Sequence, residues 1–111
     1  MVAASQWTFE TLNAAVDDEV AALPAEVQAR FIRAGELIQT GGLASLPAHW
    51  IKHLDGKIWE LRLQGRDVIG RALYVTATGR RVVVLRAFIK KTQATPLREL
   101  ELARQRMKDV R

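Results

Sequence analysis

The 111-residue sequence contains no cysteine, so it can form neither a disulfide nor a thiolate metal site, and it has no thiol nucleophile. No stretch approaches the roughly 20 consecutive apolar residues that a membrane-spanning helix needs. The first ten residues lack the basic start and the apolar run of a secretion signal. From these absences we expect a cytoplasmic protein that does not associate with membranes.

The residue types most often used for metal binding and proton transfer are also scarce. The only histidines are His49 and His53, which lie four residues apart in a stretch without a clear helical pattern. A zinc site built on them needs at least one further ligand, and Asp55 is the only candidate nearby. We therefore expect no metal ion and no cofactor. The single tyrosine, Tyr74, lies between apolar residues, so we expect it to be packed with its hydroxyl hydrogen-bonded rather than catalytic.

The remaining composition is ordinary for one globular domain, which we expect to span residues 1–111. Apolar residues make up 49% of the chain and charged residues 26%, and the net charge is +5. Residues 1–46 carry six acids and two bases, net −4, whereas residues 47–111 carry six acids and fifteen bases, net +9. A basic half of this kind is typical of a polyanion-binding protein, with a merely solvated basic surface as the plainer alternative. Nucleic acid fits better than a membrane because no basic amphipathic helix with aromatic anchors is present.

The first half of the chain predicts a strand followed by two helices. Residues 6–12 are expected to form a short strand. Apolar residues then recur at helical spacing, first in an acidic helix and then in a helix that starts with Pro24 in its first turn and ends at Gly41. These residues are Val16, Val20 and Leu23 in the first helix and Val27, Phe31, Ala34 and Ile38 in the second. The short link predicts an antiparallel helical hairpin, and residues 43–54, which have no clear period, are expected to be a connection.

The pattern then changes to the alternation of β-strands. Strands are predicted at residues 58–64, 68–77 and 80–89, and a Thr-Gly turn signal joins the last two, so the three should form an antiparallel meander. Regular alternation divides the last strand into two faces. One face holds Val83, Leu85, Ala87 and Ile89, and the other holds Val84, Arg86, Phe88 and Lys90. A C-terminal helix should follow, with Thr95 as its N-cap and Pro96 at its first position.

Together these elements predict an α+β fold: an N-terminal strand and a helical hairpin packed on an antiparallel sheet of about four strands, with a C-terminal helix. The hairpin should cover one face of the sheet and leave the second partly open. The strand residues expected on that second face are unusually basic. They are Glu60, Arg62, Arg86 and Lys90, with Arg71 at the rim. We therefore expect one site formed by four cations and a carboxylate.

Three segments, in this order, resemble the RelE/ParE toxin superfamily in its HigB-like, phage-associated branch. They are WELR at 59–62, RALYV at 71–75 and FIKKTQATP at 88–96, which RELELARQR follows. The KKTQ-x-TP piece is the most specific, and the predicted helical pair also suits the order of elements in this family. The resemblance covers essentially the whole chain. It implies a type II toxin-antitoxin toxin, most often a ribosome-dependent mRNA endonuclease that an antitoxin, usually a helix-turn-helix protein, holds inactive.

The resemblance also implies which residues act. Arg62 and Arg71 match the paired basic positions on consecutive strands, and Lys91 matches the basic pair after the last strand. When RNA is cleaved without a metal ion, its own 2′-hydroxyl attacks the phosphate, and guanidinium groups can stabilise the charge that develops there. We predict these three residues to be catalytic. The residues predicted to bind RNA beside them are Lys52, His53, Arg86 and Lys90.

The acid and base are not settled by the residues alone. Glu60, which we include among the predicted catalytic residues, lies two positions from Arg62 and could take the 2′-hydroxyl proton. The slightly favoured alternative is that Glu60 only pairs with Arg62 or Arg86 across the sheet. Family members commonly use a His or Tyr near the C-terminal strand or helix, whereas here Arg86 and Leu97 stand there. This departure is compatible with a weakened nuclease.

Two other functions fit the same resemblance. A ParE-type relative would poison gyrase through protein contacts, and its toxicity would not depend on Arg62 and Arg71. A catalytically inactive descendant would bind RNA in a salt-dependent way without cutting it. For the leading hypothesis, an mRNA interferase, the expected partners are mRNA, the ribosome and the antitoxin.

Overall fold

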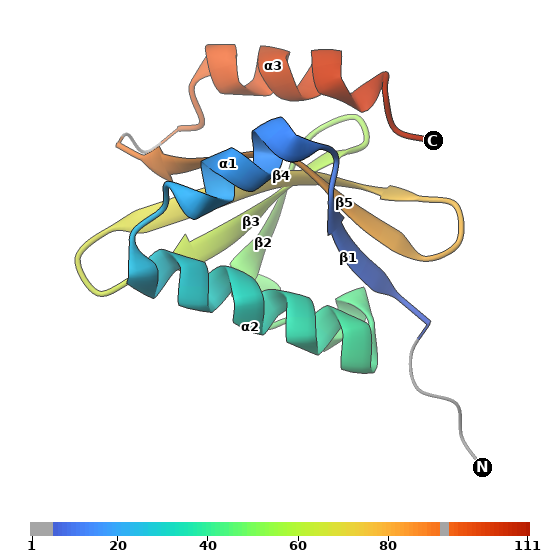
Figure 1. Ribbon diagram of the computed structural model, residues 1–111, viewed down its shortest axis with the longest axis horizontal. Coiled ribbons are helices and arrows are strands. Elements are labelled where there is room, and N and C mark those ends of the chain that lie inside the picture. The colour runs from blue at the N-terminus through green and yellow to red at the C-terminus, as the bar shows by residue number, and fades with distance from the viewer. Residues whose placement is uncertain (1–5, 92–93) are drawn as a thin grey trace.

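The computed structural model describes residues 6–91 and 94–111, and it has the α+β architecture predicted from the sequence (Figure 1). Thr92 and Gln93 of the KKTQ-x-TP segment lie outside the described residues. The elements in chain order are β1 (Thr8–Thr11), α1 (Ala14–Ala21), α2 (Ala25–Gly41), the 3₁₀ turns η1 (Leu43–Ser45) and η2 (Ala48–Trp50), β2 (Ile51–Asp55), β3 (Ile58–Gln64), β4 (Ile69–Ala77), β5 (Arg81–Lys90) and α3 (Leu97–Met107).

The sheet has five strands in the order β1-β5-β4-β3-β2, rather than about four. The additional strand is β2, which lies at one edge of the sheet and pairs antiparallel with β3. We expected only a connection there, because its five residues show no alternation that stands out without their partner strand. β1 pairs parallel with β5, and the other pairs are antiparallel. The predicted turn between β4 and β5 is confirmed, with positive φ angles at Gly79 (89°) and Arg80 (59°).

A β-bulge in β5 overturns the predicted alternation of its faces. Leu73 of β4 lies opposite Arg86, whereas the next residue, Tyr74, lies opposite Val84, so Leu85 is an extra residue. The extra residue exchanges the faces on either side of it. Val83 and Leu85 therefore pack on the same side as Phe88, and Val82 and Val84 pack on the same side as Ala87.

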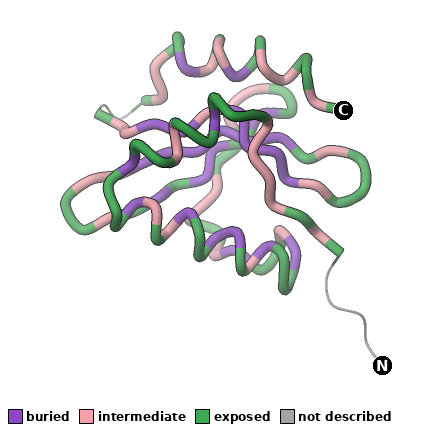
Figure 2. The backbone as a smooth tube through the Cα atoms, in the orientation of Figure 1, coloured by how far each residue is buried: buried purple, intermediate pink, exposed green. Residues whose placement is uncertain are grey.

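The two faces of the sheet carry two apolar clusters, covered by different helices (Figures 1 and 2). Val16 of α1 and the predicted face of α2 bury against one side of the sheet. On the other side α3 packs over β4 and β5 through Ala103, and Ile58 of β3 is buried in the same cluster. The area around the exposed side chains of Lys52 and Arg62 stays open, so this face is partly open, as predicted. Gly70 of β4 permits the close packing of α2, since a Cβ there would lie 2.5 Å from Val27 Cγ1. Among the described residues, none of the helices is both long and apolar enough to cross a membrane.

Tyr74 is packed, as predicted, but its hydroxyl, which we expected to be hydrogen-bonded, has no hydrogen-bond partner among residues 6–91 and 94–111. The side chain is 1% exposed and lies on the α2 side of the sheet. Burial raises the pKa of Tyr74 to about 12. The phenol therefore stays neutral at physiological pH and faces away from the basic side of the sheet.

An ion-pair network binds the edge of β5 beyond the end of β1. Glu19 of α1 accepts a hydrogen bond from the Ala87 N–H (3.3 Å), and Arg106 of α3 donates to the Leu85 carbonyl (2.8 Å). The two side chains also pair with each other at 2.8 Å, and Arg86 bonds to both Glu19 (3.1 Å) and Glu99 (2.8 Å). Burial alone would raise the pKa of Glu19, but the hydrogen bonds and positive charges of these partners lower it. The network therefore ties α1 and α3 to a strand edge that would otherwise have unpaired backbone groups.

We expect Glu19→Gln to lower the free energy of unfolding at pH 7 by about 1.5 to 3 kcal/mol, because it weakens charge-assisted hydrogen bonds. Since the pKa of Glu19 is lowered in the folded state, its contribution is present above the unfolded-state pKa and is lost as the pH falls through the folded-state pKa. Urea unfolding of both proteins from pH 7 to pH 3 should show the difference shrinking. Glu36→Gln, at an exposed pair with Arg33 (3.6 Å), is the matched control and should change stability by less than about 0.5 kcal/mol.

Candidate active site

Four adjacent strands bring basic side chains to one pocket on the uncovered part of the α3 face. The pocket measures about 230 Å³. The strand register explains the convergence, because Lys52 of β2 lies opposite Glu60 of β3, and Arg62 of β3 lies opposite Arg71 of β4. Lys90 ends β5 and lies two residues beyond Phe88, the partner of Arg71. The lining residues are His49, Trp50, Ile51, Lys52, Glu60, Arg62, Arg71 and Lys90.

Glu60 and Arg71 form a buried ion pair at the base of this pocket. Each residue is 4% exposed, and Arg71 Nε lies 2.5 Å from Glu60 Oε1. Buried charges of this kind are tolerated when each faces an opposite charge. From the sequence we favoured a structural pair, but with Arg62 or Arg86 as the partner of Glu60 and with Arg71 at the rim. The diagonal contact between neighbouring strands selects Arg71 instead.

The second oxygen of Glu60 accepts a hydrogen bond from Thr95, for which we predicted a different role. We expected Thr95 to cap the C-terminal helix, with Pro96 as the first helical residue. The structure has Pro96 itself at the N-cap, without a side-chain capping bond, and α3 begins at Leu97. The Thr95 hydroxyl donates to Glu60 Oε2 instead. The segment before α3 is thereby attached to the base of the pocket.

The electrostatics of the pocket favour a bound anion. Burial lowers the pKa of Arg71, and so does the neighbouring charge of Arg62, although Glu60 opposes both. Burial also lowers the pKa of Lys90, and the charges of Arg71, Lys52 and Arg62 lower it further. Four cations thus repel one another around a single carboxylate. An anion with several oxygens, such as a phosphate, would relieve this repulsion and could accept paired hydrogen bonds from a guanidinium.

The fold agrees with a family match. The sequence profile of the Gp49-like phage-derived proteins (DUF891) matches residues 18–108. The chain belongs to this family. The Gp49-like family is a toxin-like family within the RelE/ParE-like toxin superfamily, which confirms the predicted resemblance at that level. No curated protein matches the chain. The matched segment contains every residue that lines the pocket.

Three of the predicted site residues lie outside the pocket of this Gp49-like chain. Lys91 is exposed and follows the last residue of β5, so it adjoins the pocket without being one of its described lining residues. His53 alternates with Lys52 and faces the other way, where its ring packs edge-on against Trp59 at 5.1 Å and Nε2 lies 2.7 Å from the Gly56 carbonyl. Arg86 is on the correct face but is occupied by Glu19 and Glu99.

Three lining residues of the Gp49-like chain, His49, Trp50 and Ile51, were not predicted as site residues. His49 and Trp50 come from the short turn η2, which leads into the unpredicted strand β2. The signal that could have indicated them is their position just before Lys52, a residue that was assigned to the groove. Imidazole is the side chain that most often transfers protons in enzymes, so His49 is a candidate for the acid–base group that was missing from the predicted set. No group of three His, Asp or Glu side chains within residues 6–91 and 94–111 is arranged to hold a metal ion.

Proposed function

We propose that this Gp49-like protein is a type II toxin of the HigB-like kind that cleaves mRNA at the ribosome. The single observation that supports this function most is the pocket in which Lys52, Arg62, Arg71 and Lys90 surround one carboxylate. The family match supplies the toxin-like character, and the charges of the pocket supply the reason to choose a phosphate-containing substrate.

The chemistry needs no metal-bound water, because RNA carries its own nucleophile. The 2′-oxygen forms a bond to the adjacent phosphorus, the bond from phosphorus to the 5′-oxygen breaks, and a 2′,3′-cyclic phosphate and a 5′-hydroxyl result. One proton leaves the 2′-hydroxyl and another reaches the departing 5′-oxygen. The phosphorane between these steps carries additional negative charge, which preorganised cations stabilise without reorientation.

Each pocket residue then has a role that follows from its contacts. Arg62 is exposed, and within the part of the chain that the structure describes its guanidinium donates only to Gln64 Oε1 (2.9 and 3.2 Å), so it can turn paired donors toward the phosphorane. Arg71 stabilises the same charge from below. Glu60, with both oxygens engaged, positions Arg71 rather than accepting a proton. His49 transfers the protons, and the ammonium groups of Lys90 and the adjacent Lys91 attract the scissile and neighbouring phosphates.

The expected partners follow from the same charges. The half-chain of net charge +9 would attract an acidic antitoxin segment, and we propose that the antitoxin is a helix-turn-helix protein encoded with the toxin. Blocking either the pocket or access to the ribosome would hold the nuclease inactive.

A translation reaction with purified protein tests the function. We expect mRNA to be cut inside its translated region only while ribosomes move along it, and the fragments to carry 5′-hydroxyl ends that a kinase labels without prior phosphatase treatment. Inhibited translation with intact mRNA would contradict a nuclease. Broken DNA in cells that express the protein would instead support the gyrase alternative, and RNA binding without any cleavage would support the inactive one.

A further inference from the structure

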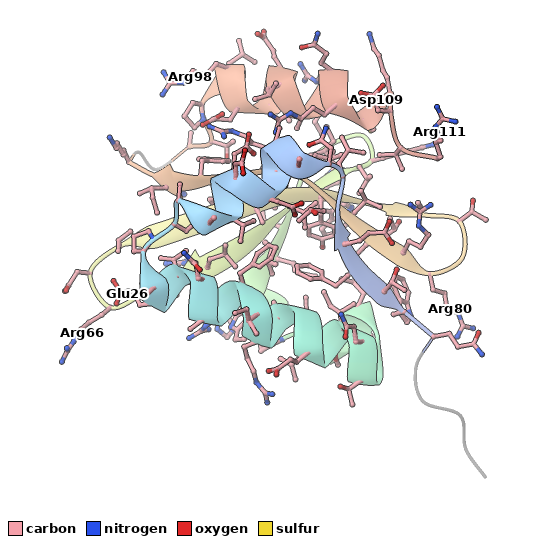
Figure 3. The ribbon with its side chains drawn as sticks, in the orientation of Figure 1. Glu26, Arg66, Arg80, Arg98, Asp109 and Arg111 are labelled. Atoms are coloured by element: carbon pink, nitrogen blue, oxygen red, sulfur yellow. The ribbon has the colours of Figure 1, made fainter. Side chains whose placement is uncertain are left out.

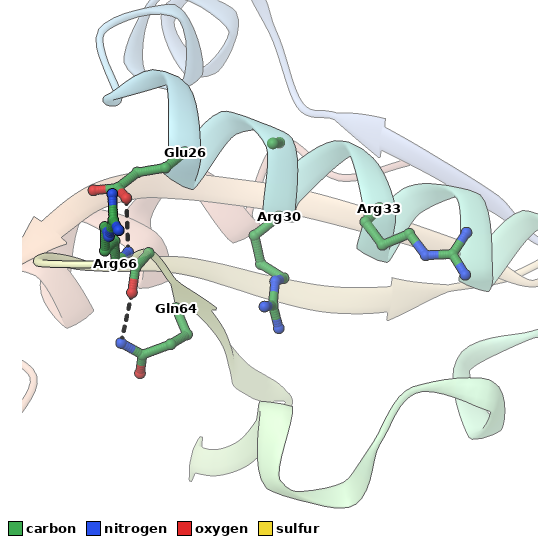
Figure 4. A pocket seen from close by; sticks show the side chains of 7 residues that line it. Glu26, Arg30, Arg33, Gln64 and Arg66 are labelled. Carbon is green, nitrogen blue, oxygen red and sulfur yellow. Dashed lines mark hydrogen bonds between the residues drawn. The ribbon is translucent and has the colours of Figure 1, made fainter.

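We infer that a second basic groove, between α2 and the β3–β4 turn, binds the backbone phosphates of the same RNA strand beyond the nucleotide held in the pocket. This inference rests on the proposed function for the identity of the strand. The groove is open and measures about 440 Å³. It is lined by Glu26, Ala29, Arg30, Arg33, Gln64, Gly65 and Arg66 (Figure 4).

The positive charges of the groove are well placed for a chain of phosphates. Arg30 and Arg33 project from the same side of α2, about one helical turn apart, and Arg66 lies at the end of the groove near Glu26 (Figure 4). Within the described residues, Glu26 forms no ion pair with the Arg66 guanidinium. Its Oε2 instead accepts a hydrogen bond from the Arg66 backbone N–H at 2.7 Å. Arg33 has an exposed and loose contact with Glu36 at 3.6 Å. The guanidinium groups of Arg33 and Arg66 are therefore available to an incoming polyanion, and Arg30, which lies over the Trp50 ring, adds a third positive charge to the groove.

Two contacts join this groove to the catalytic pocket. The Arg30 guanidinium lies 4.5 Å from the ring centre of Trp50, and Trp50 lines the pocket while Arg30 lines the groove. On the β3 side, Gln64 lines the groove and accepts hydrogen bonds from Arg62 of the pocket. A strand of nucleic acid that leaves the pocket past Trp50 or Arg62 would thus next meet the cations of the groove.

The walls of the groove are held in place before any ligand binds. The hydrogen bond from the Arg66 N–H to Glu26 fastens the β3–β4 turn to the first turn of α2, and Gln64 Nε2 donates to the Gly65 carbonyl at 2.9 Å (Figure 4). Gly65 permits this approach, because a Cβ there would lie 3.0 Å from the Glu26 side chain. The relative position of Arg66 and α2 therefore does not have to be created on binding.

The lining favours nucleic acid over a protein segment. Ala29 is the only apolar side chain among the described lining residues, whereas protein interfaces are anchored by large apolar or aromatic groups inserted into pockets. Phosphates need only charge and paired donors, which arginine supplies in the required planar geometry. An open groove also accommodates a flexible single strand.

The test compares two lengths of 2′-O-methyl RNA, which cannot be cleaved through the 2′-oxygen. A trinucleotide fills only the pocket, and a dodecamer reaches the groove. For Arg30→Ala/Arg33→Ala we expect unchanged trinucleotide affinity. For the dodecamer, the slope of log affinity against log salt concentration should be shallower by about 1.4, since each single-strand phosphate contact contributes about 0.7. Over a fourfold salt range this changes the fall in dodecamer affinity by about sevenfold. Fluorescence anisotropy from 50 to 200 mM salt measures both affinities.

Two further variants separate the groove from a general charge effect. Arg30→Lys/Arg33→Lys keeps both charges and should retain the wild-type slope. Lys108→Ala/Arg111→Ala removes two charges from the C-terminal end, where Arg111 lies at the opposite end of the molecule from Arg66 (Figure 3), and should leave both affinities unchanged. Circular dichroism and the thermal midpoint confirm that the variants fold.

The outcomes distinguish the groove from the pocket. A wild-type dodecamer slope in Arg30→Ala/Arg33→Ala overturns the groove, while trinucleotide binding still supports the pocket. An equal loss in Lys108→Ala/Arg111→Ala also overturns it, because net charge alone would then explain the effect. A dodecamer that depends on Arg30 and Arg33 while the trinucleotide binds to no variant supports the groove and counts against the pocket. Equal competition by a poly-glutamate peptide overturns the preference for nucleic acid.

Discussion

Arg71→Met is expected to lose about 3 to 5 kcal/mol of its free energy of unfolding, because it leaves the carboxylate of Glu60 buried without its cation. This is a large fraction of the 5 to 15 kcal/mol that a domain of this size typically has. The Thr95 hydroxyl alone cannot compensate, since a neutral donor replaces little of the hydration that the buried carboxylate loses. Urea unfolding at pH 7, followed by circular dichroism, measures the loss.

A double substitution keeps this prediction testable if Arg71→Met does not fold. Glu60→Met/Arg71→Met removes both charges, and replacement of a buried ion pair by apolar groups is often neutral or stabilising, so we expect this variant to be much more stable than Arg71→Met. Arg62→Met, at the exposed cation opposite Arg71, is the matched control and should change stability by less than about 0.5 kcal/mol. A double variant as unstable as Arg71→Met would show that the site depends on the shape of these side chains rather than on their pairing.

Arg62→Ala is expected to lower the rate of mRNA cleavage by about 10² to 10³-fold without lowering stability. Removal of one preorganised donor to a developing negative charge has an effect of this size in other enzymes. Arg62 suits the test because its side chain is exposed, so a fall in rate cannot be ascribed to unfolding. Single-turnover cleavage on programmed ribosomes, read by primer extension, measures the rate directly.

Two companions make the result specific to the guanidinium. Arg62→Lys keeps the charge but loses the paired donors, so its rate should lie between those of Arg62→Ala and the wild type. Lys108→Ala removes an exposed charge from the end of α3 and should cleave at the wild-type rate. Unchanged cleavage by Arg62→Ala would remove Arg62 from the catalytic set. Unchanged toxicity with intact mRNA would point to a target other than RNA.

Most of the fold could be predicted because its signals are local. The apolar positions of α2 repeat within one or two turns of the same helix, and the alternation of residues 58–64 is contained within β3. The signals that failed belong to pairs of strands. β2 is defined by its pairing with β3, and the bulge at Leu85 exists only relative to β4. Neither can be recognised in the strand that carries it.

The site could be predicted in part for the same reason. Glu60 and Arg62 share a face because they are two residues apart on one strand, and this held. His49 was not recognised, because its place at the pocket depends on β2, and Arg86 was assigned to RNA although α1 and α3 supply acids that hold it.

By itself, the sequence determined the helix and strand periods, the excess of positive charge in the second half and the set of basic residues on one face of the sheet, since each depends on neighbours a few positions away. The tertiary structure decided which cation pairs with Glu60, that Thr95 binds its second oxygen and that Arg30 adjoins Trp50. These contacts join residues as far as 35 positions apart in the chain. Only the register of the strands and the packing of the helices can bring such residues into contact.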